Sequence, residues 1–210
     1  MFSEHNFLLF LVAAILLNLA PGPDLLYVLS RSVAQGKRAG RLSSFGVCTG
    51  ALVHAMAAAL GLSAILATSA YAFSVVKWVG ALYLIYLGLH AIFSKNGHLS
   101  FDSLEVKEQS GWAIFSQGVL TDVLNPKVAI FFLSFLPQFV DPKAGCQTVQ
   151  LLVLGLIVVL IAVIWEFVVV SFAARITRVL RNNSWLTPWL NRTMGLIFIG
   201  LGVRLATEKG

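Results

Sequence analysis

The chain has 210 residues, of which 58% are hydrophobic and only 11% are charged. An ordinary soluble domain carries roughly 25% charged residues, so this composition argues against a soluble domain and indicates a chain whose solvent is lipid. The formal net charge of +6 does not indicate a nucleic-acid-binding protein, because the cations of a membrane protein gather on the side of the bilayer that retains them.

Six apolar runs follow one another along the chain, and a bilayer crossing needs roughly 20 apolar residues. Their predicted bounds are Phe7–Ser30, Leu42–Thr68, Val75–Phe93, Trp112–Leu136, Val149–Ala174 and Leu186–Ala206. Met1–Asn6 includes Glu4 and lacks a cationic segment, so we expect the first run to be a retained helix rather than a cleaved signal peptide. We therefore predict an all-α integral membrane protein with one transmembrane domain over residues 1–210.

Lysines and arginines are distributed unevenly among the segments that connect these runs. Nine of them follow runs one, three and five, and three lie on the opposite side. The nine are Arg31, Lys37, Arg38, Arg41, Lys95, Lys107, Arg175, Arg178 and Arg181, and the three are Lys143, Arg204 and Lys209. Cationic connections stay in the cytoplasm, so we predict that both termini lie outside.

Runs one and four each contain a proline motif near their middle. The first motif is Asn18-Leu-Ala-Pro21-Gly22-Pro23-Asp24, and the second is Asp122-Val-Leu-Asn125-Pro126-Lys127. Proline inside a helix removes a backbone hydrogen bond and clashes with the carbonyl four residues earlier. In lipid the freed backbone groups need partners within the protein or in a watery cavity. We therefore predict that both helices are broken at these motifs.

Runs three and six also resemble each other, since both space glycines around an aromatic residue. Run three reads Gly80-Ala-Leu-Tyr83 and continues to Gly88, and run six reads Gly195-Leu-Ile-Phe198 and continues to Gly202. Each half crosses the membrane three times, which is an odd number, so the second half enters the membrane with the opposite orientation. Many secondary transporters consist of such inverted repeats. We predict repeat halves over about residues 1–94 and 111–206, joined by a cytoplasmic linker over 95–110.

The two breaks predict a binding site near the bilayer midplane. A helix that restarts after a break exposes amides and partial positive charge that can hold a carboxylate. The freed carbonyls on the other side can accept from an ammonium group, and an amino-acid zwitterion needs both. The predicted substrate- and ion-binding residues are Asn18, Pro21, Gly22, Pro23, Asp24, Asp122, Asn125, Pro126 and Lys127.

Charged side chains in these runs have two interpretations, since a charge at the bilayer centre costs roughly 2.5–3.5 kcal/mol on insertion scales. In the structural interpretation, Lys127 pairs with Asp122 or with Asp24 across the bundle. In the functional interpretation, Asp24 or Asp122 carries a coupled proton and Lys127 holds the substrate carboxylate. His54 and Glu166 are candidate proton relays, although a lone intramembrane histidine is often a packed helix contact.

The order and spacing of these motifs resemble the lysine exporter and homoserine/threonine resistance (LysE/RhtB) family of bacterial amino-acid efflux proteins, over nearly the whole chain. The strongest parts are Pro21-Gly22-Pro23-Asp24, Gly36–Gly40, Gly80–Leu84, Leu124–Lys127, Leu136–Phe139 and Leu190–Leu205. The resemblance implies a transporter, and not an enzyme, that exports amino acids across the bacterial inner membrane, driven by the proton gradient. Both termini would then be periplasmic.

One position departs from that family. Many members carry an acidic residue one turn before the tryptophan of the fifth span, whereas this chain has Ala162 there and places Glu166 just after Trp165. The contribution of the fifth span to coupling therefore stays open. We expect an amino acid, protons and lipid as partners, without nucleic acid, cofactor or metal, and the small-residue helix faces fit a monomer or a homodimer.

Three other classes of protein compete with an exporter. A passive pore would carry a flux that ignores the proton gradient. An intramembrane hydrolase needs a nucleophile beside a base such as His54. A thiol–disulfide carrier needs two thiols that meet, but Cys48 lies in run two and Cys146 in an outer connection, away from both proline motifs.

Overall fold

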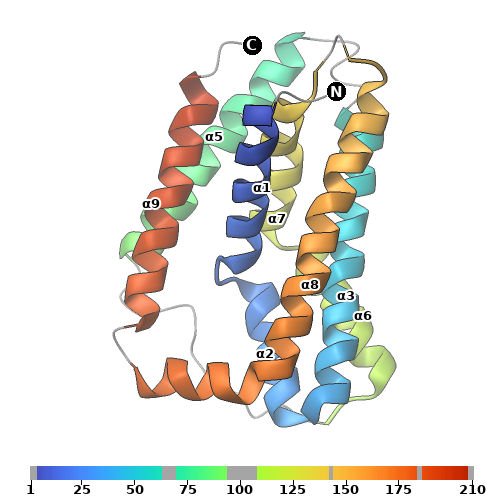
Figure 1. Ribbon diagram of the computed structural model, residues 1–210, viewed down its shortest axis with the longest axis vertical. Helices are drawn as coiled ribbons and strands as arrows, with labels where there is room; N and C mark the ends of the chain where they lie inside the picture. Colours follow the sequence, from blue (N-terminus) through green and yellow to red (C-terminus); the bar gives the residue numbers. More distant parts are fainter. Residues whose placement is uncertain (1–3, 63–69, 94–107, 142–143, 184–185, 208–210) are drawn as a thin grey trace.

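A computed structural model describes residues 4–62, 70–93, 108–141, 144–183 and 186–207. Over these residues the chain forms helices and no strands, which confirms the all-α prediction. The helices run up and down one bundle, and α1 begins at the same end of the bundle at which α9 finishes (Figure 1).

The helices follow the predicted runs. They are α1 (Glu4–Leu19), α2 (Pro23–Ala34), α3 (Gly36–Ala57) with the π-helical turn η1 (Ala58–Leu62), α5 (Ala70–Phe93), α6 (Gly111–Val123), α7 (Pro126–Ile130) with the π-helical turn η2 (Phe131–Phe135) and the 3-10 turn η3 (Leu136–Phe139), α8 (Gln147–Asn182) and α9 (Leu186–Thr207). The predicted end of run two at Thr68 and most of the predicted linker over 95–110 lie outside the described residues.

Helix ends at one side of the bundle extend further than predicted. The first run ends at Ala34 instead of Ser30, α3 begins at Gly36 instead of Leu42, and α8 continues to Asn182. The last turns of α8 lie across the end of the bundle opposite the start of α1 (Figure 1). Polar and basic side chains continue these helices beyond the apolar runs, so hydropathy underestimates their length.

Both predicted proline breaks are present. The angle between Phe7–Leu19 and Pro23–Ala34 is 48°, and the angle between Gly111–Val123 and Pro126–Phe139 is also 48°. Proline is accepted in the first turn of a helix because the amides there have no helical acceptor, and Pro23 and Pro126 each occupy that turn.

Several described segments can cross a membrane by length and composition. Gly36–Gly61 and Gln147–Val179 do so as single helices, and each of the two bent pairs passes the same test as one broken span. Ala81–His90 is a shorter apolar helix. The chain thus has the apolar helices of a membrane protein.

Glycines set the close contacts between helix pairs. A methyl group added at Gly46 of α3 would collide with the backbone carbonyl of Phe115 in α6, and one at Gly118 would lie 2.7 Å from the carbonyl oxygen of Ser43. One at Gly202 of α9 would lie 2.8 Å from the carbonyl oxygen of Ala81 in α5. Small residues let membrane helices approach closely, so α3 packs on α6 and α5 packs on α9 through these positions.

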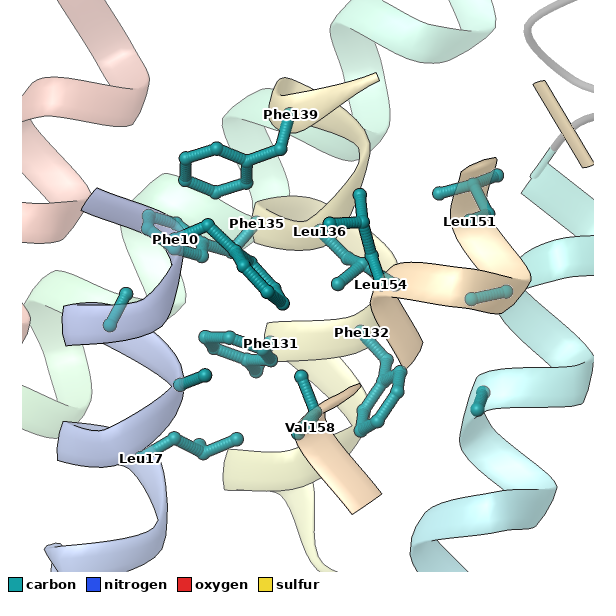
Figure 2. Close-up of a cluster of buried hydrophobic side chains, with 14 of the residues drawn as sticks. Phe10, Leu17, Phe131, Phe132, Phe135, Leu136, Phe139, Leu151, Leu154 and Val158 are labelled. Carbon is teal, nitrogen blue, oxygen red and sulfur yellow. The ribbon is translucent and has the colours of Figure 1, made fainter. Parts of the chain in front are cut away.

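Aromatic side chains fill the bundle between the proline breaks and the end where α1 begins. We call Phe10, Phe131, Phe132, Phe135 and Phe139 the aromatic cluster; all five are buried. The ring centroids of Phe10 and Phe139 are 5.5 Å apart and those of Phe135 and Phe139 are 5.1 Å apart. Figure 2 shows these rings from α1, η2 and η3 meeting beside leucines of α8. The cluster fills this part of the bundle between α1, η2, η3 and α8.

Candidate functional site

An ion pair joins the two broken helices. The Lys127 ammonium, near the start of α7, donates to both carboxylate oxygens of Asp24 in α2, at 3.2 and 3.0 Å. The same ammonium donates to the carbonyl oxygens of Ala20 at 3.1 Å and Leu17 at 3.4 Å. The side chains of Lys127 and Asp24 are only 8% and 13% exposed. Of the pairings considered for Lys127, the one with Asp24 forms.

Gly22 makes room for this ion pair. A methyl group at Gly22 would lie 2.5 Å from Oδ1 of Asp24 and 2.9 Å from Nζ of Lys127. Any larger residue would therefore have to displace one or both charged groups. The glycine between the two prolines is required by the pair beside it and not by its own backbone angle, since its φ of −152° is ordinary extended backbone.

The two asparagines of the motifs stabilise the helix ends. Asn125 precedes α7, and its Oδ1 accepts from the backbone amide of Lys127 at 3.1 Å, as an N-cap residue does. Its side-chain nitrogen is buried and has no hydrogen-bond partner among the described residues. Asn18 donates from Nδ2 to the carbonyl of Ala14 within α1, at 2.8 Å.

A pocket of about 390 Å³ opens between the two breaks and the α5–α9 pair, and small-molecule sites span roughly 300–1,000 Å³. Its lining residues are Pro21, Gly22, Pro23, Leu26, Tyr83, Tyr86, His90, Asn125, Pro126, Lys127 and Phe198. The wall is mainly apolar and aromatic, with Lys127 and Asn125 as polar groups at the breaks. We refer to it as the open pocket.

The sequence prediction missed five of these lining residues, namely Leu26, Tyr83, Tyr86, His90 and Phe198. A signal was present, because Tyr83 and Phe198 occupy matching places in the glycine-containing motifs of runs three and six. From sequence, those motifs indicate the repeat and do not indicate a pocket wall. In the structure Gly88 and Gly202 of these motifs pack α5 against α9, and the aromatic residues face the open pocket.

A second, smaller cavity of about 20 Å³ lies on the other side of the ion pair. Its volume suits about one water molecule. It is lined by Leu17, Asn18, Asp24, Val47, Ala51, Asp122, Val128, Phe132, Val158, Ala162 and Glu166. Three carboxylates therefore meet at one buried cavity, which we call the carboxylate cavity. Asp24 lines it, while its partner Lys127 lines the open pocket.

The other two carboxylates of this cavity are not paired with Lys127. Asp122 is 2% exposed, and its Oδ2 has no hydrogen-bond partner among the described residues. Glu166 is 5% exposed, and its Oε2 accepts from the Ser44 hydroxyl at 3.1 Å. An uncompensated buried charge is costly. Among the described residues one ammonium group faces three acids at this cavity, so a proton taken up by one of the acids would remove an uncompensated negative charge.

His54 lies beside Asp122 but contacts its backbone. Nε2 of His54 is 3.2 Å from the Asp122 carbonyl oxygen. The imidazole ring also stacks on Phe132, with centroids 6.0 Å apart. The structural role considered for His54, a packed helix contact, is therefore present. No three histidine, cysteine, aspartate or glutamate side chains within the described ranges are arranged to hold a metal ion.

The two cysteines are free thiols in different environments. Cys48 is buried in α3, and Cys146 is exposed at the start of α8. Hydrogen bonds from the backbone amides of Val149 and Thr148 lower the pKa of the Cys146 thiol below its usual range. A thiol with a lowered pKa at an exposed position is open to alkylation.

Broken apolar helices, an ion pair between them and a ligand-sized pocket define a membrane transport protein. The chain belongs to the LysE type translocator family, whose model matches residues 15–209. It is 32% identical to a leucine efflux protein of Klebsiella pneumoniae over 99% of both chains. It is 30% identical to a leucine efflux protein of Salmonella typhimurium over 99% of both chains. An uncharacterized membrane protein of Vibrio cholerae is 33% identical over 98% of both chains.

No solved structure matches the chain. The family match confirms the resemblance that the motifs indicated. The protein is accordingly a membrane transporter and not an enzyme, which removes the intramembrane hydrolase from the alternatives.

Proposed function

We propose that this protein exports neutral amino acids with apolar side chains, leucine first, across the bacterial inner membrane. The Lys127–Asp24 ion pair beside the open pocket carries this proposal, because an α-amino acid presents the same two charges. The apolar wall with Leu26, Tyr83 and Phe198 suits a branched aliphatic side chain. The relatives named as leucine efflux proteins support the same substrate.

The proposed architecture is six membrane crossings in two inverted repeats, over about residues 1–94 and 111–206. The equal 48° bends of the two broken spans support this repeat. Both termini are proposed to be periplasmic. In support, α1 begins at the end of the bundle at which α9 finishes (Figure 1). The first turn of α3, with the exposed Lys37 and Arg38, and the last turns of α8, with the exposed Arg175, lie at the opposite end. Basic residues of membrane proteins favour the cytoplasmic side, which supports this orientation.

Alternating access follows from this arrangement. The aromatic cluster fills the bundle between the breaks and the end that holds the termini (Figure 2). We take it as the closed periplasmic gate of this conformation. Export then requires that the rings from α1 separate from those of η2 and η3. The closed gate also argues against a passive pore, whose pathway would be continuous.

Proton antiport is the proposed driving reaction. The carboxylate cavity contains two buried acids, Asp122 and Glu166, without a basic partner among the described residues, and Asp24 adjoins them. Asp24 or Asp122 is proposed to carry the proton, with Glu166 and His54 as relays. A proton bound on one side and released on the other neutralises this excess of acids during part of the cycle.

Efflux from proteoliposomes tests the function. Vesicles holding purified protein are loaded with a mixture of labelled amino acids, and release is followed with and without an imposed pH gradient. We expect release of leucine and similar neutral residues, accelerated by an inward proton gradient, and no such release from protein-free vesicles. If folded protein releases no amino acid, amino-acid export is rejected. Release that ignores the gradient would instead indicate a passive pathway.

A further inference from the structure

The Lys127 ammonium occupies a site built from acceptors of the other broken helix. The carbonyl of Leu17 lacks a helical donor because residue 21, four positions later, is proline and has no N–H. The carbonyl of Ala20 lies in the break itself. These two oxygens lie 3.4 and 3.1 Å from Nζ of Lys127, and the carboxylate of Asp24 completes the set at 3.0 Å. We call these three groups the ammonium cradle.

The cradle adjoins the open pocket. Lys127, Pro21 and Gly22 line that pocket, so the lysine side chain forms the part of the wall that separates the pocket from the acceptors. A lysine carries its charge on a flexible four-carbon stem with three rotatable donors. Its ammonium can therefore turn from the cradle into the pocket while α7 stays in place.

We propose that the cradle is the subsite for the ammonium group of the transported amino acid, and that Lys127 is a resident substitute for that group. This inference rests on the proposed export of amino acids. On entry, the substrate ammonium replaces Nζ of Lys127 on Asp24 and on the two carbonyls. The displaced Lys127 ammonium then pairs with the substrate carboxylate in the open pocket.

Charge pairing explains why the exchange selects zwitterions. Before and after the exchange, Asp24 faces one ammonium group and Lys127 faces one carboxylate. A ligand with only an amino group would leave Lys127 unpaired, and a ligand with only a carboxylate would leave Asp24 unpaired. Leaving a buried charge without its partner is strongly unfavourable. Lys127 is thus a specificity-determining residue that demands both groups on one molecule.

A purely structural ion pair has a different consequence. Its role would be to fix the two breaks against each other, and the charged groups of a ligand would not compete with it. Removing Lys127 would then lower stability and create no affinity for free amines. The two interpretations therefore differ in which ligands a variant without Lys127 can bind.

The test measures ligand-induced thermal stabilisation of purified protein, which rises with binding to the folded state. The probes are leucine, 3-methylbutylamine (leucine without its carboxylate) and 4-methylpentanoate (leucine without its amino group). With the wild-type chain, we expect each single-charge probe to bind about 100-fold more weakly than leucine, or worse. With Lys127→Gln, the vacated cradle should bind 3-methylbutylamine roughly tenfold more tightly than the wild type does.

Three further variants control this comparison. Asp24→Asn/Lys127→Gln lacks the cradle carboxylate, and the gain for 3-methylbutylamine should vanish. Lys127→Arg keeps a cation in the cradle and should show no gain. Lys37→Gln removes an exposed lysine and should match the wild type. If Lys127→Gln folds poorly by itself, purification with and without 3-methylbutylamine replaces the titration, because an occupied cradle should restore the folded yield.

Two outcomes would overturn the inference. In the first, Lys127→Gln binds 3-methylbutylamine no more tightly than the wild type does, and the amine does not raise its folded yield. In the second, the affinity for 4-methylpentanoate increases in Lys127→Gln as much as the affinity for 3-methylbutylamine. These results are separate from the proposed export. An amine gain in Lys127→Gln, with no leucine binding to the wild type, supports the subsite and rejects leucine as substrate. Leucine binding without an amine gain rejects only the subsite.

Discussion

The broken span formed by α1 and α2 and the one formed by α6 and α7 bend by the same 48°, but they offer different groups to the space between them. The first offers acceptors, namely two backbone carbonyls and the Asp24 carboxylate. The second offers a donor, the Lys127 ammonium, on a helix start that Asn125 caps. A repeated backbone shape can therefore bind a zwitterion when the two copies differ in charge.

Removing one charge of the Lys127–Asp24 pair should have the largest effect on the stability of the protein. Lys127→Met leaves Asp24 buried without its partner, and breaking such a pair costs about 3–5 kcal/mol. The double variant Asp24→Asn/Lys127→Met removes both charges and should recover most of that loss. Thermal unfolding of the purified variants measures both, with exposed Lys37→Met as control. A double variant no more stable than the single one would show that the pair contributes little.

Adding a methyl group between the two breaks should have the next largest effect on stability. Gly22→Ala places a methyl group 2.5 Å from a carboxylate oxygen of Asp24, so the pair must shift, at a cost of about 1–3 kcal/mol. Gly200→Ala is the matched control, because a methyl group there meets nothing within 4 Å. Helix propensity favours alanine there by up to about 1 kcal/mol. Equal stability and equal leucine efflux of both variants would contradict this role of Gly22.

Neutralising an acid next to the pair tests the coupling. A gradient of one pH unit supplies about 1.4 kcal/mol per proton. Asp122→Asn cannot carry a proton, so we expect leucine efflux from proteoliposomes to lose its acceleration by the gradient. Exposed Asp141→Asn should keep it. If Asp122→Asn responds to the gradient like the wild type, the proton lies elsewhere, with Asp24 as the next candidate.

The smallest effect is expected at the periphery, where the orientation can be tested without disturbing transport. Cys146 is exposed and Cys48 is buried, so a membrane-impermeant maleimide added to intact cells should label Cys146 alone. Its lowered pKa predicts labelling at neutral pH, because the thiolate reacts. Cys146→Ser should abolish the signal. Labelling only after the cells are opened would place this end of the bundle in the cytoplasm.

The breaks and the helical spans could be predicted from the sequence because their causes are local. Pro21, Pro23 and Pro126 interrupt helices through their own covalent structure, and the length of an apolar run sets a span. The partner of Lys127 could not be chosen, because Asp24 and Asp122 are equally plausible until the breaks are placed against each other.

The pocket wall could not be predicted for a different reason. Tyr83 and Phe198 lie on helices that are apolar nearly all round, so their matching motifs indicate a repeat but do not indicate which helix face is turned inward. The predicted helices also ended too early, because they followed the apolar runs. Arg31 extends α2 beyond its apolar run because its guanidinium is buried and donates to Gln35 and Gln117.

A structure of the protein with leucine bound tests the central claim most directly. The account predicts the leucine ammonium group within hydrogen-bond distance of Asp24 and the carbonyls of Leu17 and Ala20. The leucine carboxylate should lie on Lys127, with the side chain against Tyr83 and Phe198 in the open pocket. Leucine bound elsewhere, or bound in the pocket while Lys127 and Asp24 stay paired, would contradict the account.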